Sequence, residues 1–148
     1  MIRFHLFLVI CLLLPAACSH DDGPPLVFTN VRVLAPLPGR SASVAYMDIL
    51  NQSQNVITID SVSSPEFARA EMHETVLSDG IARMQALDFV AVEAASQLSF
   101  APAGKHIMLL DPKSGLLPGG TVRLEIRLDD GGLLIIDAPV QTRNIATE

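Results

Sequence analysis

Two histidines and two methionines in this chain have types and spacing that suit metal binding. In KHIMLLDP, residues 105–112, His106 stands two residues before Met108. Because side chains alternate along a strand with a period of two, a strand here would place both on one face. Upstream, His73 and Met84 flank the turn signal SDG, and a hairpin at that turn would fold Met84 back towards His73. Two strand regions can therefore each offer one imidazole and one thioether.

Such a set of ligands favours Cu(I). Thioether sulfur is soft and neutral, and soft ligands favour Cu(I) over Zn²⁺, Mg²⁺ or Ca²⁺. Four neutral ligands suit a monovalent ion, whereas ions of higher charge normally draw carboxylate or thiolate. The alternative for each side chain is that a His is a satisfied polar residue and a Met fills the core. We adopt this alternative for Met47, in an apolar run, and for Met72, which alternates onto the face opposite His73.

The composition argues against several other classes of function. The 148 residues, 49% of them hydrophobic, suit one domain with a sizeable core. The net charge of −6 argues against a nucleic-acid partner. The chain contains no Trp and one Tyr, so stacking platforms for bases or sugars are not evident. We find no nucleophile–base pair, phosphate loop or zinc motif, and therefore do not expect an enzyme.

The N-terminus has the pattern of an export signal. Arg3 precedes an apolar run over residues 4–14, which is too short to span a bilayer comfortably. LLPAAC then places small residues before Cys18 and resembles the bacterial lipobox, although Pro15 stands where an aliphatic residue is usual. We expect a signal peptide over residues 1–17 and lipidation of the cysteine that follows. The alternative is a plain signal peptidase site after PAA or AAC.

Cysteine usage agrees with lipidation. Cys11 lies in the segment to be removed, so Cys18 remains alone and cannot form an internal disulfide. No cysteine is left for a His₂Cys blue-copper site either. We expect residues 18–25 to tether a periplasmic domain to a membrane, and Ser19 after the cysteine weakly favours the outer membrane. A free amine at residue 18 would make His20 a candidate Cu(II) ligand, but acylation removes that amine.

From residue 26 onward the pattern is one of short strands. Turn signals recur about every ten residues. Residues 121–128 alternate polar and apolar side chains, and DDGG then turns the chain, which predicts a hairpin over residues 121–140. FARAEMHETVL, residues 67–77, has the propensity of a helix, but its alternation favours a strand. The prediction is an all-β fold, an antiparallel β-sandwich over residues 26–141, followed by a polar tail over 142–148.

The order of the four candidate ligands resembles that of a known family. The spacing is similar to the signature of PCuAC, periplasmic copper chaperones for the Cu-A centre. Ten residues separate His73 from Met84, twenty-one separate Met84 from His106, and one separates His106 from Met108. The flanking text matches as well, in AYMDILNQS, SVSSPEFARAEMHET, GIARM and APAGKHIMLLDPKSGLLPGGTV. The resemblance covers about residues 26–140.

This resemblance implies a cupredoxin-like Greek-key β-sandwich that binds one Cu(I) near its surface through His73, Met84, His106 and Met108. It implies delivery of copper to the Cu-A site in subunit II of cytochrome c oxidase, together with a thiol-bearing copper-handling partner. We expect a monomer. Some family members carry a second copper site in a C-terminal extension rich in His and Met, but QTRNIATE contains neither residue.

Two other functions stay open at this point. One is copper tolerance or buffering by the same site. The other is a β-sandwich interaction lipoprotein in which the His/Met set is incidental. The four candidate ligands separate a metal carrier from the interaction lipoprotein, because only a metal carrier should bind one Cu(I) and lose it when Met84 and Met108 are replaced.

Overall fold

The structure, a computed structural model, describes residues 24–143 and has an all-β fold in that range. The strands are β1 (Leu26–Leu34), β2 (Ala42–Asn51), β3 (Ile57–Ser63), β4 (Phe67–Ser78), β5 (Ile81–Ala86), β6 (Val90–Val92), β7 (Gln97–Phe100), β8 (Lys105–Pro112), β9 (Thr121–Leu128) and β10 (Leu133–Gln141). In the described part of the chain, no helix is long and apolar enough to cross a membrane. The strand predicted for FARAEMHETVL is confirmed as β4.

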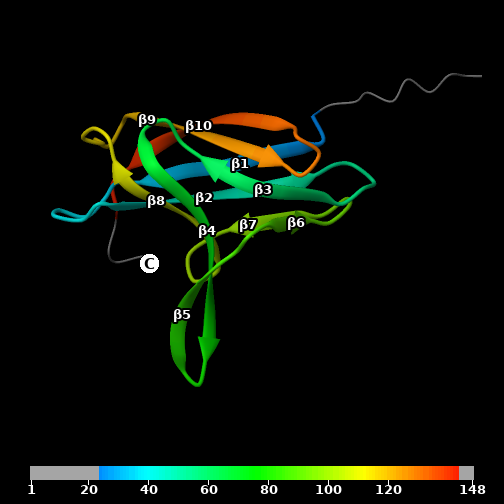
Figure 1. The fold of residues 1–148 in the computed structure, drawn as a ribbon, viewed down its shortest axis with the longest axis horizontal. Helices are drawn as coiled ribbons and strands as arrows, with labels where there is room; N and C mark the ends of the chain where they lie inside the picture. Colours follow the sequence, from blue (N-terminus) through cyan, green and yellow to red (C-terminus); the bar gives the residue numbers. More distant parts are fainter. Residues whose placement is uncertain (1–23, 144–148) are drawn as a thin grey trace, which may run out of the picture.

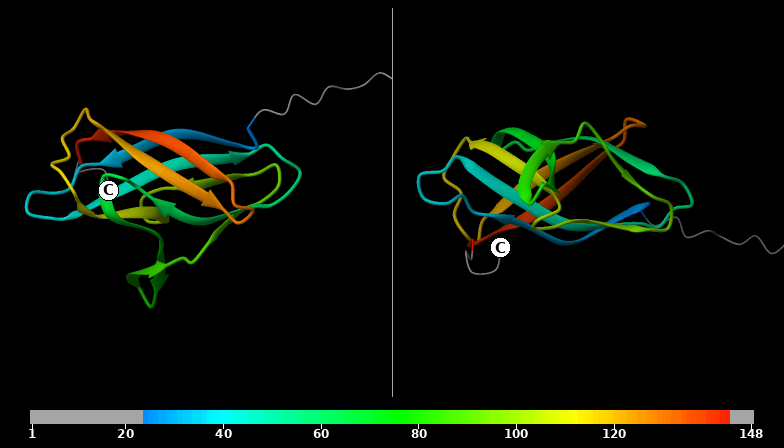
Figure 2. Two further views of the ribbon diagram at one scale, coloured as in Figure 1. Left: turned by 45° about the horizontal axis from the view of Figure 1, so that its top comes forward. Right: turned by 90° about the horizontal axis from the view of Figure 1, so that it is seen from below.

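The ten strands make two layers. One layer has the order β5-β4-β8-β7-β2-β1, and the other has the order β10-β9-β3-β6. The left view of Figure 2 shows β9 and β10 lying across the strands of the first layer. The layers join where β1 pairs with β10, and this pairing is parallel, as is the single residue pair between β7 and β8. The prediction of an antiparallel sandwich is therefore wrong at these two pairings. Where the layers join, β1 and β10 each have their direction set by an antiparallel neighbour.

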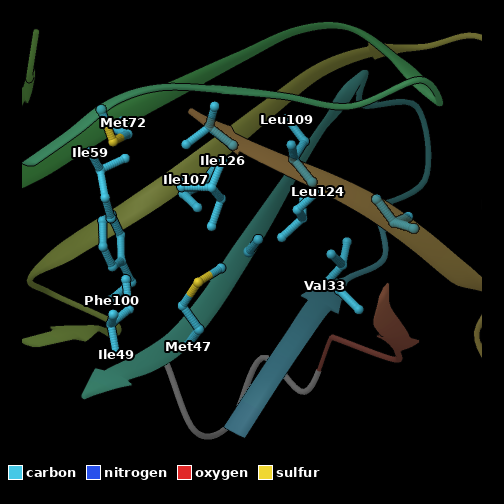
Figure 3. Packing of buried hydrophobic residues seen from close by; sticks show 14 of the residues in the cluster. Val33, Met47, Ile49, Ile59, Met72, Phe100, Ile107, Leu109, Leu124 and Ile126 are labelled. Carbon is cyan, nitrogen blue, oxygen red and sulfur yellow. The ribbon is translucent and has the colours of Figure 1, made fainter. Parts of the chain in front are cut away.

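Alternating apolar side chains from both layers form the core (Figure 3). In β9, Val122, Leu124 and Ile126 are buried, while the residues between them are exposed or half-buried. From the other layer, Met47 and Met72 are also buried, at 1% and 4% exposure, which confirms them as core residues. Each fully buried side chain of this size contributes roughly 1.5–3 kcal/mol, so the core holds the central strands in a fixed register.

The hairpin of β4 and β5 projects from the sandwich (Figure 1). Asp79 and Gly80 form its two-residue turn with φ of 53° and 76°, values that characterise a type I′ turn. Ser78 pairs with Ile81 directly across the turn, so the hairpin predicted from SDG is confirmed. β5 is exposed along its length and pairs only with β4. The hairpin is therefore held mainly by its own backbone ladder.

Candidate metal centre

The two candidate histidines lie opposite each other on neighbouring strands. β4 and β8 are antiparallel, and His73 pairs with His106 in their register. The ring centroids are 5.9 Å apart, with the ring planes inclined at 50°. The His106 residue is 6% exposed and the His73 side chain is 19% exposed. The fold thus holds two imidazoles close together at the boundary between interior and surface.

β8 places His106 and Met108 on the face of its layer that points away from the core. Ile107 and Leu109, at the alternate positions, are buried in the core at 1% and 0% exposure. This alternation fixes which way the two candidate ligands face. Met108 pairs with Val44 of β2 on its other side. The prediction that His106 and Met108 share one face is confirmed.

Met84 reaches the same face from the projecting hairpin. It pairs with Thr75 of β4, and Ala86 pairs with His73, so Met84 lies diagonally across the ladder from His73. Met84 is 65% exposed. It lines one pocket of about 270 Å³ together with His106 and Met108. Three of the four candidate ligands thus share this pocket, and the fourth, His73, has its ring beside that of His106.

The hydrogen bond of His106 determines which of its nitrogens is available. Its Nδ1 lies 3.0 Å from the carbonyl oxygen of Gly104. A carbonyl only accepts, so Nδ1 carries the hydrogen and the lone pair of the neutral ring is on Nε2. Gly104 belongs to the turn before β8, and its carbonyl also accepts the Thr75 backbone N–H at 3.1 Å. The turn between β7 and β8 therefore orients one imidazole and ties it to the base of the hairpin.

One ring nitrogen of His73 has no hydrogen-bond partner. Its Nε2 lies 3.0 Å from a carboxylate oxygen of Glu71, whereas its Nδ1 is buried and has no hydrogen-bond partner. Leaving a buried polar atom unsatisfied is costly, and a bound cation would satisfy it. Between residues 24 and 143, no group of three or more His, Cys, Asp or Glu side chains is placed to hold a metal ion. The sequence indicates the thioethers of Met84 and Met108 as the further ligands of a site on the two histidines.

Residues that the sequence did not single out also form the pocket. Val44 and Tyr46 line it and form a small buried cluster with Leu34, separate from the main core. Arg143 lines it too, although the residues after β10 were expected to be only a polar tail. The alternation of Val44 and Tyr46 in SVAYMD was a usable signal for a second apolar face. No local signal links Arg143 to His106.

The N-terminal predictions fall outside the part that the structure describes. The signal peptide of residues 1–17, Cys18 and His20 all precede residue 24.

The fold and this face of it define a PCuAC-type domain of the cupredoxin-like class. The solution structure of CuI-DR1885 from Deinococcus radiodurans matches with a TM-score of 0.69 and 27% identity, covering 86% of this chain and 85% of that one. The copper-bound PCuAC domain from PmoF2 matches with a TM-score of 0.68 and 21% identity, covering 80% and 94%. The predicted cupredoxin-like fold and the resemblance to the PCuAC family are confirmed.

The chain belongs to the family described as "Putative lipoprotein LpqE-like", which it matches over residues 26–140. "Putative lipoprotein Lxx21020" of Leifsonia xyli subsp. xyli is 30% identical over 111 residues, covering 74% of this chain and 67% of the relative. The uncharacterized protein RP573 of Rickettsia prowazekii (strain Madrid E) is 27% identical over 133 residues, covering 89% and 72%.

Proposed function

We propose that this protein is an exported Cu(I) chaperone and not an enzyme, with His73, Met84, His106 and Met108 as its copper ligands. The observation that carries the proposal is the placement of the two imidazoles opposite each other, with both thioethers on the same face of the layer. The likeness to the Cu(I) form of DR1885, at 27% identity and a TM-score of 0.69, supports the choice of metal. The softness of two thioethers supports it independently.

The exposures of the candidate ligands suit a carrier that must release its cargo. Met84, at 65% exposure, stands on the projecting hairpin, whereas His106, at 6%, is held between neighbouring strands. An incoming acceptor thiolate is soft and charged, and therefore competes well with a neutral thioether. We expect transfer through an intermediate in which donor and acceptor share the ion. The acceptor displaces Met84 first, because that side chain is the most accessible.

We further propose that the domain is anchored to a membrane on the periplasmic side through a lipid on Cys18. The description of the family and of the Leifsonia relative as lipoproteins supports anchoring. The weak preference for the outer membrane rests on Ser19 alone. Mass spectrometry of the mature N-terminus tests the proposal. A free amine on residue 18 or 19 would contradict it and would make His20 a candidate Cu(II) ligand.

The destination that we propose is the Cu-A site in subunit II of cytochrome c oxidase, with a thiol-bearing partner that keeps the acceptor cysteines reduced. The PCuAC resemblance supports this destination. Copper tolerance or buffering by the same site is the second candidate function. Met84 is exposed, so an acceptor can reach it, as hand-over of copper requires.

Copper binding is tested by titrating the purified domain against a Cu(I) chelator. We expect one Cu(I) per chain, little Zn²⁺ binding, and a large loss of affinity in the double variant Met84→Leu, Met108→Leu. Met72→Leu is the matched control, because Met72 is a core residue on the opposite face of β4. Unchanged affinity in the double variant would reject this site.

The destination is tested in a deletion strain grown with scarce copper. Oxidase activity should fall, return when copper is added, and return with the wild-type gene but not with the double Met→Leu variant. Normal oxidase activity at every copper level, combined with sensitivity to copper, would instead assign the protein to tolerance.

A further inference from the structure

We propose that Glu71 is a positioning residue for the copper site: its carboxylate holds His73 in the Nε2–H tautomer, so that Nδ1 is the nitrogen available to the metal. This inference rests on the proposed function for its purpose, but the tautomer itself is a property of the copper-free protein. Glu71 was not among the residues that the sequence singled out.

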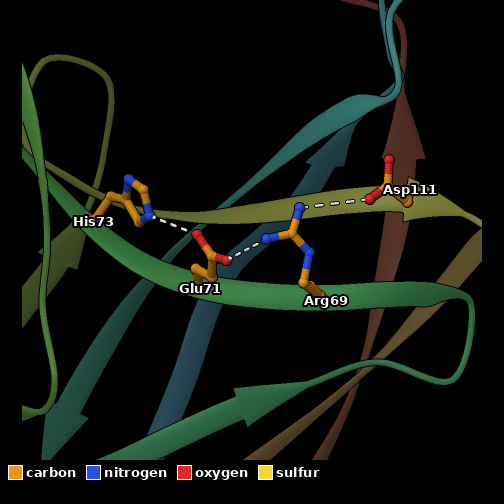
Figure 4. A network of polar contacts seen from close by, with 4 residues as sticks. All are labelled: Arg69, Glu71, His73 and Asp111. Atoms are coloured by element: carbon orange, nitrogen blue, oxygen red, sulfur yellow. Dashed lines mark hydrogen bonds and ion pairs between the residues drawn. The ribbon is translucent and has the colours of Figure 1, made fainter.

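The carboxylate of Glu71 is fixed by contacts on both oxygens (Figure 4). One oxygen lies 3.0 Å from Nε2 of His73, and the other accepts a hydrogen bond from Arg69 Nη1 at 3.1 Å. Nη2 of Arg69 in turn lies 3.5 Å from a carboxylate oxygen of Asp111 in β8. With one oxygen engaged by Arg69, the other oxygen of this carboxylate serves as the acceptor for the ring. Arg69 and Asp111 extend the support from β4 to the neighbouring strand.

The two-residue period of β4 explains why this carboxylate meets this ring. Arg69, Glu71 and His73 occupy alternate positions and therefore share the outward face. In the register with β8, Glu71 pairs with Met108 and His73 pairs with His106. The positioning carboxylate thus stands on the same face as the candidate ligands, one ladder step from the imidazole pair.

The other nitrogen of His73 provides independent evidence. Nδ1 is buried and has no hydrogen-bond partner. If Nδ1 carried the hydrogen, the ring would bury an unsatisfied donor and would also turn a lone pair of Nε2 towards the Glu71 oxygen. With the hydrogen on Nε2, that hydrogen is donated to Glu71 and the buried Nδ1 presents a lone pair. Carboxylate partners of this kind orient histidine ligands in metal sites and raise their basicity.

The two histidines therefore carry the ring hydrogen on different nitrogens. Gly104 holds the hydrogen of His106 on Nδ1, whereas Glu71 holds the hydrogen of His73 on Nε2. The acceptor is a backbone carbonyl in one case and a charged side chain in the other. Only the second can be removed by a point substitution, so Glu71 is the residue through which the orientation of a copper ligand can be tested.

The first experiment uses the copper-free full domain. Long-range ¹⁵N–¹H NMR spectra of the imidazoles, recorded at a mildly alkaline pH, report which nitrogen carries hydrogen. We expect Nε2–H for His73 and Nδ1–H for His106. Nδ1–H at His73 in the wild-type protein would overturn the proposal without any variant being needed.

The second experiment compares Glu71→Ala with Glu74→Gln. Glu74 is the matched control: it lies on the same strand, is half-buried and forms an ion pair with Lys105 at 2.6 Å, yet it is not bonded to either histidine. In Glu71→Ala we expect His73 to lose its preference for Nε2–H and Cu(I) affinity to fall roughly 10–100-fold. Glu74→Gln should change neither. An unchanged tautomer and an unchanged affinity in Glu71→Ala would refute the positioning role.

The two readouts also separate this proposal from the proposed function. Failure of the wild-type domain to bind Cu(I) would reject the chaperone, whereas the tautomer of His73 would still be decided by the spectra of the copper-free protein. Arg69→Gln adds a graded test. It leaves the Glu71–His73 contact but removes the ion pair on the other carboxylate oxygen. We therefore expect a smaller loss of the Nε2–H preference and a smaller fall in Cu(I) affinity than in Glu71→Ala.

Discussion

His73 and His106 face each other across the β4–β8 ladder with their ring centroids 5.9 Å apart. Two rings bound to one ion, with a metal–nitrogen bond of roughly 2 Å as in zinc–imidazole sites, have centroids about 5–6 Å apart. The imidazole pair is thus already spaced for a shared metal ion. Preorganisation of this kind reduces the ordering cost of binding.

A preorganised site predicts that copper binding changes little beyond the site. Adding one equivalent of Cu(I) should shift backbone amide resonances in β4, β5, β8 and the turn before β8. Resonances of β3 and β9, in the other layer, should stay in place. A ¹H–¹⁵N correlation spectrum with and without Cu(I) measures this, and shifts spread evenly over both layers would show that binding rearranges the sandwich.

Met84→Leu should separate affinity from stability. Met84 is 65% exposed, so the change should alter the free energy of unfolding by less than about 0.5 kcal/mol. Cu(I) affinity should nevertheless fall, because leucine offers no sulfur. Urea unfolding and chelator competition measure the two quantities. The volume-conserving Met72→Leu should cost less than about 1.5 kcal/mol and leave affinity unchanged; the opposite pattern would place the ligand on the core side of β4.

Gly80→Ala should weaken copper binding through the turn that carries Met84. Gly80 has a φ of +76° with open space around it, so an added Cβ clashes with nothing but forces a left-handed conformation that costs about 1–2 kcal/mol. We expect faster hydrogen exchange in the β4–β5 hairpin and a lower Cu(I) affinity. Gly131→Ala is the matched control, because Gly131 has a φ of +89° and equally open space but lies in the β9–β10 turn. Equal losses of affinity in both variants would dismiss the hairpin as the cause.

Asp48 should make the stability of the fold depend on acid pH. Hydrogen bonds from Ser99, and then from Asn30, hold the pKa of the Asp48 carboxyl below its usual range, and the nearby charge of Arg32 acts in the same direction. Because the folded pKa is depressed, the stabilisation is present above the unfolded pKa of about 3.9 and is lost as the pH falls through the folded pKa. Urea unfolding from about pH 5 downwards should show this loss.

Two variants attribute the acid dependence to Asp48. Asp48→Asn removes the titrating group, so its free energy of unfolding should fall less steeply with acid. Ser99→Ala removes the hydrogen bond that lowers the pKa of Asp48 most, so it should raise this pKa, with a similar but smaller effect on the slope. Slopes identical to that of the wild-type protein in both variants would assign the acid dependence to other groups.

Several features of the site were predictable from the sequence because they depend on local periodicity. The alternation in KHIMLLDP places His106 and Met108 on one face, since Ile107 and Leu109 gain free energy by entering the core. The SDG signal predicts the hairpin, because Asp79 and Gly80 tolerate the positive φ of a type I′ turn. The spacing of the four candidate ligands was enough for the resemblance to PCuAC.

Only the tertiary structure decided which strands meet. Nothing in the sequence near His73 or His106 states that β4 lies beside β8 in a register that pairs the two rings. That pairing follows from the packing of one layer on the other, which sums many long-range contacts. The same packing brings Val44, Tyr46 and Arg143 to the pocket from distant parts of the chain. The hydrogen bond from His73 to Glu71 depends on both levels. The period of β4 puts the two residues on one face, while the folded surroundings bury Nδ1 and leave it without a hydrogen-bond partner.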